Sequence, residues 1–94
     1  MIIAVDFDGT LCCDNIANDR LIRKLKQHQR RGDIVILWTC RTPKHTAEAV
    51  AFLRTRGFVP NFVNQNCPQA IQMLGHDPRK IYADIYIDDK GVRP

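Results

Sequence analysis

The chain has 94 residues, of which 45% are hydrophobic and 26% are charged, and its formal net charge is +4 at pH 7. These proportions exclude disordered and membrane proteins and are typical of folded globular chains. Because short chains bury a small fraction of their surface, this length suffices for one core only. We therefore predict a single domain spanning residues 1–94.

The longest apolar stretch, Ile34 to Trp38, is too short to cross a bilayer, so we expect no membrane partner. The four cysteines show no paired metal-ligand spacing, and reduced thiols in a cytoplasmic protein are the simplest interpretation. One segment is crowded with cations, namely Arg20, Arg23, Lys24, Lys26, Arg30 and Arg31. On a helix these cations would form a solvated face, which we favour over a nucleic-acid-binding surface.

Two short apolar runs, Ile2 to Val5 and Ile34 to Trp38, predict strands that are covered on both faces. Between them, Asn18 or Asp19 is suited to cap a helix that runs to a left-handed stop at Gly32. A strand, a helix and a second strand in this order predict a βαβ unit, in which the two strands are parallel.

A second helix is predicted after the second strand, with Thr42 as its cap and Pro43 at its first position, ending before Gly57. Its predicted inward side chains are those of Ala47, Val50, Ala51 and Leu53. A short third strand at residues 58–63 is expected to be broken or at an edge, because Pro60 removes one hydrogen-bond donor.

The last predicted elements are a helix from Pro68 to Leu74, which stops at Gly75, and a strand from Ala83 to Ile87. Strands that alternate with helices through short connections predict an open parallel sheet with right-handed crossovers. The predicted fold class is thus α/β, a three-layer Rossmann-like sheet flanked by helices.

Polar side chains stand where the predicted strands end. Asp6 and Asp8 follow the first strand, Thr39 follows the second, and Asp88 and Asp89 follow the last. In open parallel sheets, ligands bind beyond the carboxyl ends of the strands. Four carboxylates at one edge repel each other unless a cation shares the site, and oxygen ligands suit Mg²⁺. With the metal bound, Asp6 is a candidate nucleophile, and Asp8 a candidate acid and base.

The segment Asp6-Phe7-Asp8-Gly9-Thr10, directly after an apolar strand, resembles the first motif of haloacid-dehalogenase-like (HAD) phosphatases. Thr39 is similar to the second motif of that family, Lys80 to the third, and Asp88-Asp89 to the fourth. The segment before Asp88 also resembles that of deoxyribonucleotidase-like members. The four similarities follow the order of the family and span nearly the whole chain.

The resemblance implies a Mg²⁺-dependent phosphatase that works through an aspartyl-phosphate on Asp6. It implies four catalytic residues: Asp6 as nucleophile, Asp8 as acid and base, and Thr39 and Lys80 as phosphoryl clamps. It implies metal ligands at Asp6, Asp8 through its backbone carbonyl, Asp88, and Asp89 through a bound water. It places substrate-binding residues at Gly9, Thr10, Cys40 and Arg41. Arg41 and Lys44, near a helix N-terminus, are alternatives to Lys80 as the clamp.

Family members usually carry a cap domain, and the spacing between the motifs leaves no room for one here. The resemblance therefore implies a capless member with an open site, suited to phosphorylated small molecules, including nucleotides, or to phosphorylated ends of macromolecules. A partner subunit in a homo-oligomer would help to exclude water from such a site. The alternative function is a phosphate- or nucleotide-binding module with little turnover.

Four further side chains near the predicted strand ends have weaker interpretations. Trp38 and Phe7 could stack on an aromatic substrate, although core packing is the more common role of such residues. Asn64 and Asn66 are secondary candidates for substrate contacts. A cysteine phosphatase is disfavoured, because Cys40-Arg41 lacks the phosphate-binding loop that such an enzyme needs.

Overall fold

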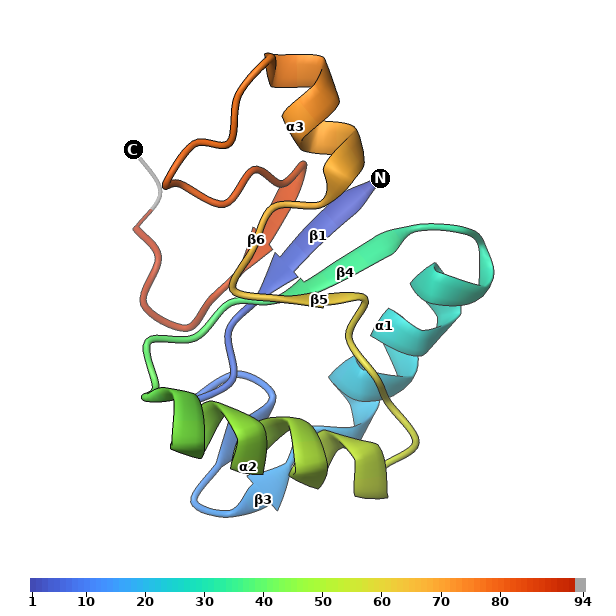
Figure 1. Cartoon of the computed structure of the whole chain (residues 1–94). Coiled ribbons are helices and arrows are strands. Elements are labelled where there is room, and N and C mark those ends of the chain that lie inside the picture. Colours follow the sequence, from blue (N-terminus) through green and yellow to red (C-terminus); the bar gives the residue numbers. More distant parts are fainter. Residues whose placement is uncertain (93–94) are drawn as a thin grey trace.

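The computed structural model describes residues 1–92, which form an α/β fold around a four-stranded parallel sheet (Figure 1). The strands lie in the order β5-β4-β1-β6. Their bounds are Ile2–Val5 for β1, Ile34–Leu37 for β4, Phe62–Val63 for β5 and Ile85–Ile87 for β6. Strand β1 is central and pairs in parallel with both β4 and β6, so the two predicted apolar runs are neighbours.

Three helices flank the sheet, α1 (Asp19–Arg30), α2 (Pro43–Thr55) and α3 (Pro68–Leu74). Side chains from α1 and α2 share one buried cluster with Ile3 and Val5 of β1, whereas Ala4 of β1 belongs to a cluster on the opposite face. The connection from β5 to β6 crosses back over the sheet, and right-handed crossovers place its helix, α3, on that opposite face. Figure 1 shows this arrangement. The predicted class, an open parallel Rossmann-like sheet flanked by helices, is confirmed.

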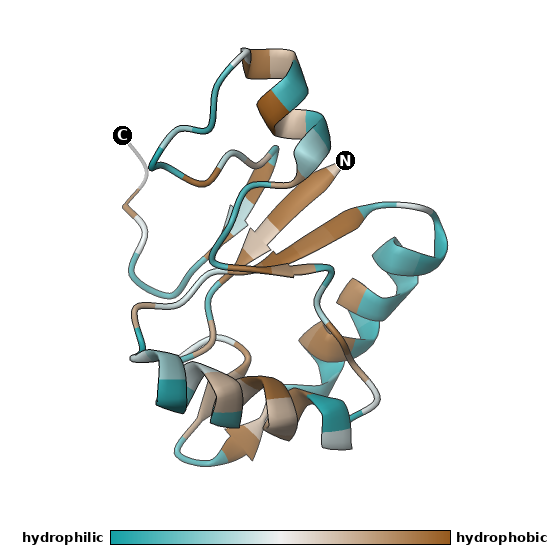
Figure 2. Ribbon diagram, viewed as in Figure 1, coloured by the Kyte–Doolittle hydropathy of each residue, from teal (hydrophilic) through white to brown (hydrophobic). Residues whose placement is uncertain are grey.

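The helix α1 begins where the sequence predicts. Asn18 is its N-cap and accepts a hydrogen bond from the N–H of Leu21 at 3.2 Å. Its buried residues are Ile22 and Leu25, and its cations are mainly exposed; in Figure 2 much of the α1 ribbon has the teal of hydrophilic residues. None of the helices in residues 1–92 is long and apolar enough to cross a membrane.

A small antiparallel hairpin that the sequence analysis missed precedes α1. Its strands are β2 (Cys12–Cys13) and β3 (Ile16–Ala17). The two turn residues, Asp14 and Asn15, have φ of 51° and 63°. A two-residue hairpin turn of type I′ needs positive φ at both central residues, and Asp and Asn tolerate this conformation better than most residues. The dipeptide Asp14-Asn15 was therefore the available signal.

The predicted strand at residues 58–63 shrinks to Phe62–Val63. Phe58 is fully buried in the core instead of extending the strand. Beyond Pro60, the side chain of Asn61 accepts a hydrogen bond from the N–H of Val35 at 2.8 Å, while its backbone N–H donates to the carbonyl of Val35. An asparagine side chain thus replaces part of the strand ladder. The predicted last strand is likewise shorter and starts at Ile85.

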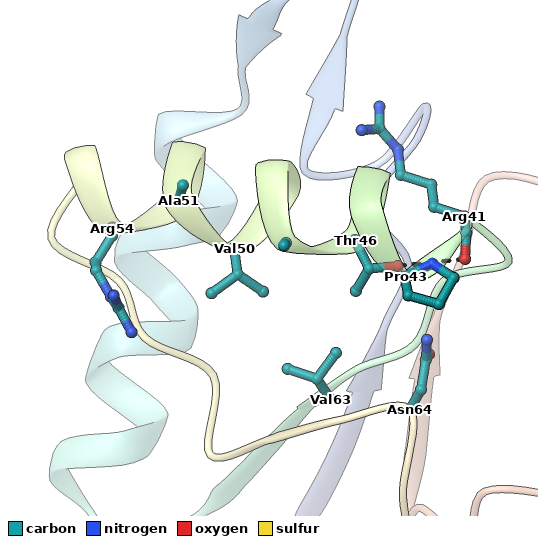
Figure 3. Close-up of a pocket in the computed structure, with 9 residues that line it drawn as sticks. Arg41, Pro43, Thr46, Val50, Ala51, Arg54, Val63 and Asn64 are labelled. Atoms are coloured by element: carbon teal, nitrogen blue, oxygen red, sulfur yellow. Dashed lines mark hydrogen bonds between the residues drawn. The ribbon is translucent and has the colours of Figure 1, made fainter.

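The inward face of α2 differs from the prediction. Its buried residues are Thr46, Ala49 and Leu53, whereas Ala47 and Ala51 are exposed. These two alanines border an open groove between α2 and the edge strand β5, together with Val50 and Val63 (Figure 3). Alanine fits both buried and exposed helix positions, so the periodicity of small residues did not determine which side of α2 faces the sheet.

Candidate active site

The loop after β1 is fixed by one buried side chain. The N–H of Asp6 donates to the carbonyl of Ile87 at 3.0 Å, which extends the pairing of β1 with β6 by one residue. Phe7 then turns into the core, where it is 3% exposed and packs edge-to-face on Phe52. The carbonyl of Phe7 accepts hydrogen bonds from the N–H groups of the three residues at positions 10–12. Phe7 is therefore a core residue, and its burial holds Asp6 and Asp8 on either side of it.

The end of β1 is the topological switch point of the sheet, because the chain leaves β1 toward β4 and later returns on its other side as β6. Asp88 and Asp89 follow β6 at this edge. One carboxylate oxygen from each of Asp6, Asp88 and Asp89 lies within 4.8 Å of the other two. The structure thus brings together three of the four predicted acidic side chains.

The electrostatics of this cluster favour a bound cation. The pKa of Asp6 is raised above its ordinary value, first by burial and then by the negative charges of Asp88, Asp89 and Asp8. The N–H of Phe7, which donates to Asp6 Oδ1 at 2.8 Å, opposes this shift. A divalent cation would relieve the mutual repulsion, and three clustered carboxylate oxygens are donors of the kind that Mg²⁺ takes. The donor set therefore fits the predicted metal.

The side chain of Asp8 lies outside this group of three because Arg41 holds it. Arg41 Nη2 donates to Asp8 Oδ1 at 2.7 Å, and Nε donates to Oδ2 at 2.9 Å. These hydrogen bonds and the charge of Arg41 hold the pKa of Asp8 below its ordinary value, and Lys90 contributes to the same shift. The guanidinium also stacks on the ring of Phe7, 4.7 Å from its centroid. In Figure 3 it extends from the start of α2 away from the groove.

Thr39 follows β4 and is 8% exposed. Its N–H donates to Asn64 Oδ1 at 2.8 Å, and its hydroxyl oxygen accepts a hydrogen bond from the N–H of Arg41 at 3.3 Å. Asn64 was a candidate for substrate contact, but its side chain instead positions Thr39. Asn66 is also structural, since it is buried and bonds to Asp77 and to the backbone around it.

A pocket opens over this edge of the sheet. It is lined by Asp6, Asp8, Trp38, Thr39, Cys40, Asp88 and Lys90. Two of these residues differ from expectation. Trp38, for which core packing was the favoured role, is 37% exposed and borders the carboxylates. Lys90 was not predicted, although its position directly after the Asp88-Asp89 pair was a signal that could have identified it.

Lys80 lies elsewhere in the structure. Its Nζ is 5.6 Å from the ring centroid of Tyr86, and the pocket with the carboxylates does not include it. Lys44 is exposed at the start of α2 and is also outside that pocket. Gly9 and Thr10 border a separate hollow beside the β2–β3 hairpin. Among the predicted cations, only Arg41 directly contacts one of the four predicted acids in residues 1–92, and that acid is Asp8.

Gly9 instead contributes through its lack of a side chain. It has a φ of +79°, and a Cβ at this position would overlap the carboxylate of Asp89, with Cγ only 2.9 Å away. The first loop can approach Asp89 this closely because residue 9 is glycine. Gly75, at the end of α3, has the same φ of +79° but no neighbour within 4 Å of such a Cβ.

We expect Gly9→Ala to weaken metal binding while lowering stability only modestly. The positive φ costs an alanine ~1 kcal/mol, and the added methyl group also pushes Asp89 out of the cluster. Gly75→Ala is the matched control, because it has the same backbone strain without the collision. Titration of both variants with Mg²⁺, combined with thermal unfolding, tests this. Equal Mg²⁺ affinity in the two variants would contradict the role assigned to Gly9.

Fold and site together define an α/β protein whose open parallel sheet carries a carboxylate cluster at the carboxyl end of its central strand. No protein-family model and no curated protein matches the chain. Among solved structures, it is similar to "the conserved protein coded by locus from Bacteroides thetaiotaomicron". The TM-score is 0.82 and the identity 33%, covering 98% of this chain and 78% of that one. The chain belongs to the family of that conserved protein.

Proposed function

We propose that the protein is a Mg²⁺-dependent phosphomonoester hydrolase of the haloacid-dehalogenase-like type, with Asp6 as its nucleophile. The observation that carries this proposal is the convergence of Asp6, Asp88 and Asp89, whose oxygens lie within 4.8 Å of one another beside Thr39. Carboxylates at this separation repel each other unless a cation shares the site, and a bound cation would in turn attract an anionic phosphoryl group.

The reaction assigns a separate step to each of two carboxylates. Asp6 attacks the phosphorus atom, and the bond from phosphorus to the leaving oxygen breaks as the aspartyl-phosphate forms. The N–H of Phe7 on Oδ1 orients the Asp6 carboxylate for this attack. Asp8 gives its proton to the leaving oxygen and then takes a proton from the water that hydrolyses the aspartyl-phosphate, so Asp6 is regenerated.

Asp6, Asp88, Asp89 and the carbonyl of Asp8 would hold the metal. When bound, Mg²⁺ neutralises charge on the carboxylates and on the phosphoryl oxygens. Thr39 lines the same pocket, and its hydroxyl would donate a hydrogen bond to a phosphoryl oxygen. Lys80, which the resemblance implies, and Lys90, which lines the pocket, are the two candidate clamping lysines. Comparing phosphate release by Lys80→Ala and Lys90→Ala identifies which of them contacts the phosphoryl group.

The ion pair of Arg41 with Asp8 has to open before catalysis. While Arg41 holds it, the pKa of Asp8 is lowered, and a carboxyl with a lowered pKa is a poor proton donor near neutral pH. A phosphoryl group offers Arg41 the same bidentate partner as a carboxylate does. Substrate binding would thus transfer Arg41 from Asp8 to the phosphoryl oxygens, and the negative charge of the substrate beside Asp8 would raise the pKa of this carboxyl and favour its protonated form.

We expect Arg41→Gln to raise KM for phosphomonoesters roughly ten-fold, because one charge-assisted contact with the substrate is lost. Stability should fall by less than about 1 kcal/mol, since both side chains of the ion pair are partly exposed. Arg54→Gln, at the far end of the same helix, is the control. An unchanged KM in Arg41→Gln would show that Arg41 has no contact with the substrate.

A second function is a phosphate- or nucleotide-binding module with little turnover. The same ion pair favours it, because Arg41 binds the carboxylate of Asp8, the proposed acid, in the absence of a ligand. A phosphate-release screen over nucleotides, sugar phosphates and phosphorylated nucleic-acid ends separates the two functions. The screen compares Mg²⁺ with a chelator, and wild type with Asp6→Asn. Phosphate release that depends on both Mg²⁺ and Asp6 supports the hydrolase. Binding without release supports the module.

A further inference from the structure

Two aromatic side chains form an exposed surface beside the pocket. The rings of Trp38 and Tyr86 are 5.6 Å apart, tilted by 59°, and 37% and 39% exposed. Tyr86 pairs with Ala4 of β1, and Ala4 belongs to the sheet face opposite α1 and α2. Figure 1 shows α3 on this face near the start of β1, and none of the helices in residues 1–92 lies over the carboxyl half of the strands there.

This aromatic surface is continuous with the pocket that holds the carboxylates. Trp38 lines that pocket together with Asp6 and Thr39, while Tyr86 lines an adjacent hollow that also contains Lys80. The Tyr86 ring is held in place, because its hydroxyl donates to the carbonyl of Ile81 and accepts from the N–H of Ala83. A ligand that stacks here would therefore meet a preformed surface.

Single exposed aromatic residues are common on protein surfaces and carry no inference. Here two exposed rings touch each other, one of them borders the acidic cluster, and a lysine amine lies 5.6 Å from the centroid of the other. Stacking on aromatic side chains accepts any planar base, and the ammonium group of Lys80 can donate hydrogen bonds to ring nitrogen or carbonyl acceptors. A nucleobase offers both features, whereas a sugar or an alkyl group offers no stacking face.

We infer that Trp38 and Tyr86 bind the base of a nucleoside monophosphate whose phosphoryl group enters the carboxylate pocket. This inference rests on the proposed hydrolase function and names its class of substrate. It assigns specificity to residues on the sheet itself, next to the carboxylate pocket. Trp38 then determines which phosphomonoesters are preferred, and the acidic cluster determines that a phosphoryl group is bound.

The experiment uses the full chain with Mg²⁺ and three probes: adenosine 5′-monophosphate, ribose 5-phosphate and phenyl phosphate. Trp38 is the only tryptophan of the chain, so its fluorescence reports directly on stacking. We expect the nucleotide to quench this fluorescence and to have a kcat/KM about ten-fold or more above that of ribose 5-phosphate. Trp38→Leu should remove this preference, and Trp38→Phe should retain most of it. Met73→Ala, an exposed apolar residue of α3, is the control.

The outcomes separate the inference from the function on which it rests. If all three phosphates are hydrolysed equally, or if Trp38→Leu keeps the preference for the nucleotide, the hydrolase stands and the base-binding surface is wrong. If kcat/KM for phenyl phosphate exceeds that for the nucleotide, the aromatic surface binds the aryl group of an aryl ester, and the assignment of a nucleobase is overturned. If no probe binds or is hydrolysed, both proposals fail. Thermal unfolding of Trp38→Leu and Trp38→Phe checks that each variant is folded.

Discussion

Under the proposed hydrolase mechanism, replacing Asp6 with asparagine is expected to lower kcat/KM for phosphomonoesters by about 10³-fold or more. An amide cannot attack phosphorus to form an acyl-phosphate, and the loss of a covalent nucleophile is among the largest single effects in enzyme catalysis. Phosphate release at saturating Mg²⁺ measures the effect. Asp14→Asn, an exposed acid in the turn of the β2–β3 hairpin, is the matched control and should keep full activity.

The same substitution should not destabilise the fold. Asparagine can accept the hydrogen bond from the N–H of Phe7 just as Asp6 does. The pKa of Asp6 is raised by burial and by its acidic neighbours. The protonated side chain therefore favours the folded state below about pH 4, and this stabilisation is lost as Asp6 ionises and the pH rises through the raised value. Without metal, Asp6→Asn should therefore unfold at the same temperature as wild type at pH 3 and at a higher temperature at pH 7. A lower Tm at pH 7 would contradict the repulsion inferred for the cluster.

Mg²⁺ is expected to stabilise the folded protein, and a chelator to reverse the effect. A ligand that binds only the folded state adds about 2.7 kcal/mol at a concentration of 100 times its Kd. For a domain of this size, that free energy corresponds to a rise in Tm of roughly 10 °C or more. The physical reason is that the carboxylates of Asp6, Asp88 and Asp89 converge only in the folded chain. Thermal unfolding over a Mg²⁺ titration measures the shift.

Asp88→Asn identifies the origin of this stabilisation. It removes one charge from the cluster, so we expect a smaller shift with Mg²⁺ and, without metal, a Tm equal to or above that of wild type. Asp14→Asn again serves as the control for the loss of one exposed negative charge. If Mg²⁺ raises the Tm of Asp88→Asn as much as that of wild type, the ion binds elsewhere and the metal site is wrong.

Local sequence signals determined most of the elements and the residues at the strand ends. Short apolar runs predicted β1 and β4 because strands buried on both faces carry few polar residues. Asn18, Thr42 and Gly75 marked helix ends because caps and left-handed stops depend on a few neighbouring residues. Parallel strands end at one edge of the sheet, so the order of strands and acids was enough to predict that Asp6 and Asp88 lie close together.

Other features depended on contacts between segments distant in the chain. The burial of α2 was assigned to the wrong alanines, since small residues fit both sides of a helix. Asn61 and Asn64 gained structural roles because their side chains accept hydrogen bonds from the backbone N–H groups of Val35 in β4 and of Thr39. Neither contact has a signature within a short window of sequence.

The carboxylates at the end of β1 and β6 could thus be predicted from the sequence by itself, because strand direction places them at one edge. Only the tertiary structure decided what surrounds them. It turned Asp8 toward Arg41, brought Lys90 and Trp38 to the pocket and set Lys80 against Tyr86. The reason is physical: the strand order determines where the backbone of a residue lies, whereas the packing of side chains from several elements determines where its functional group lies.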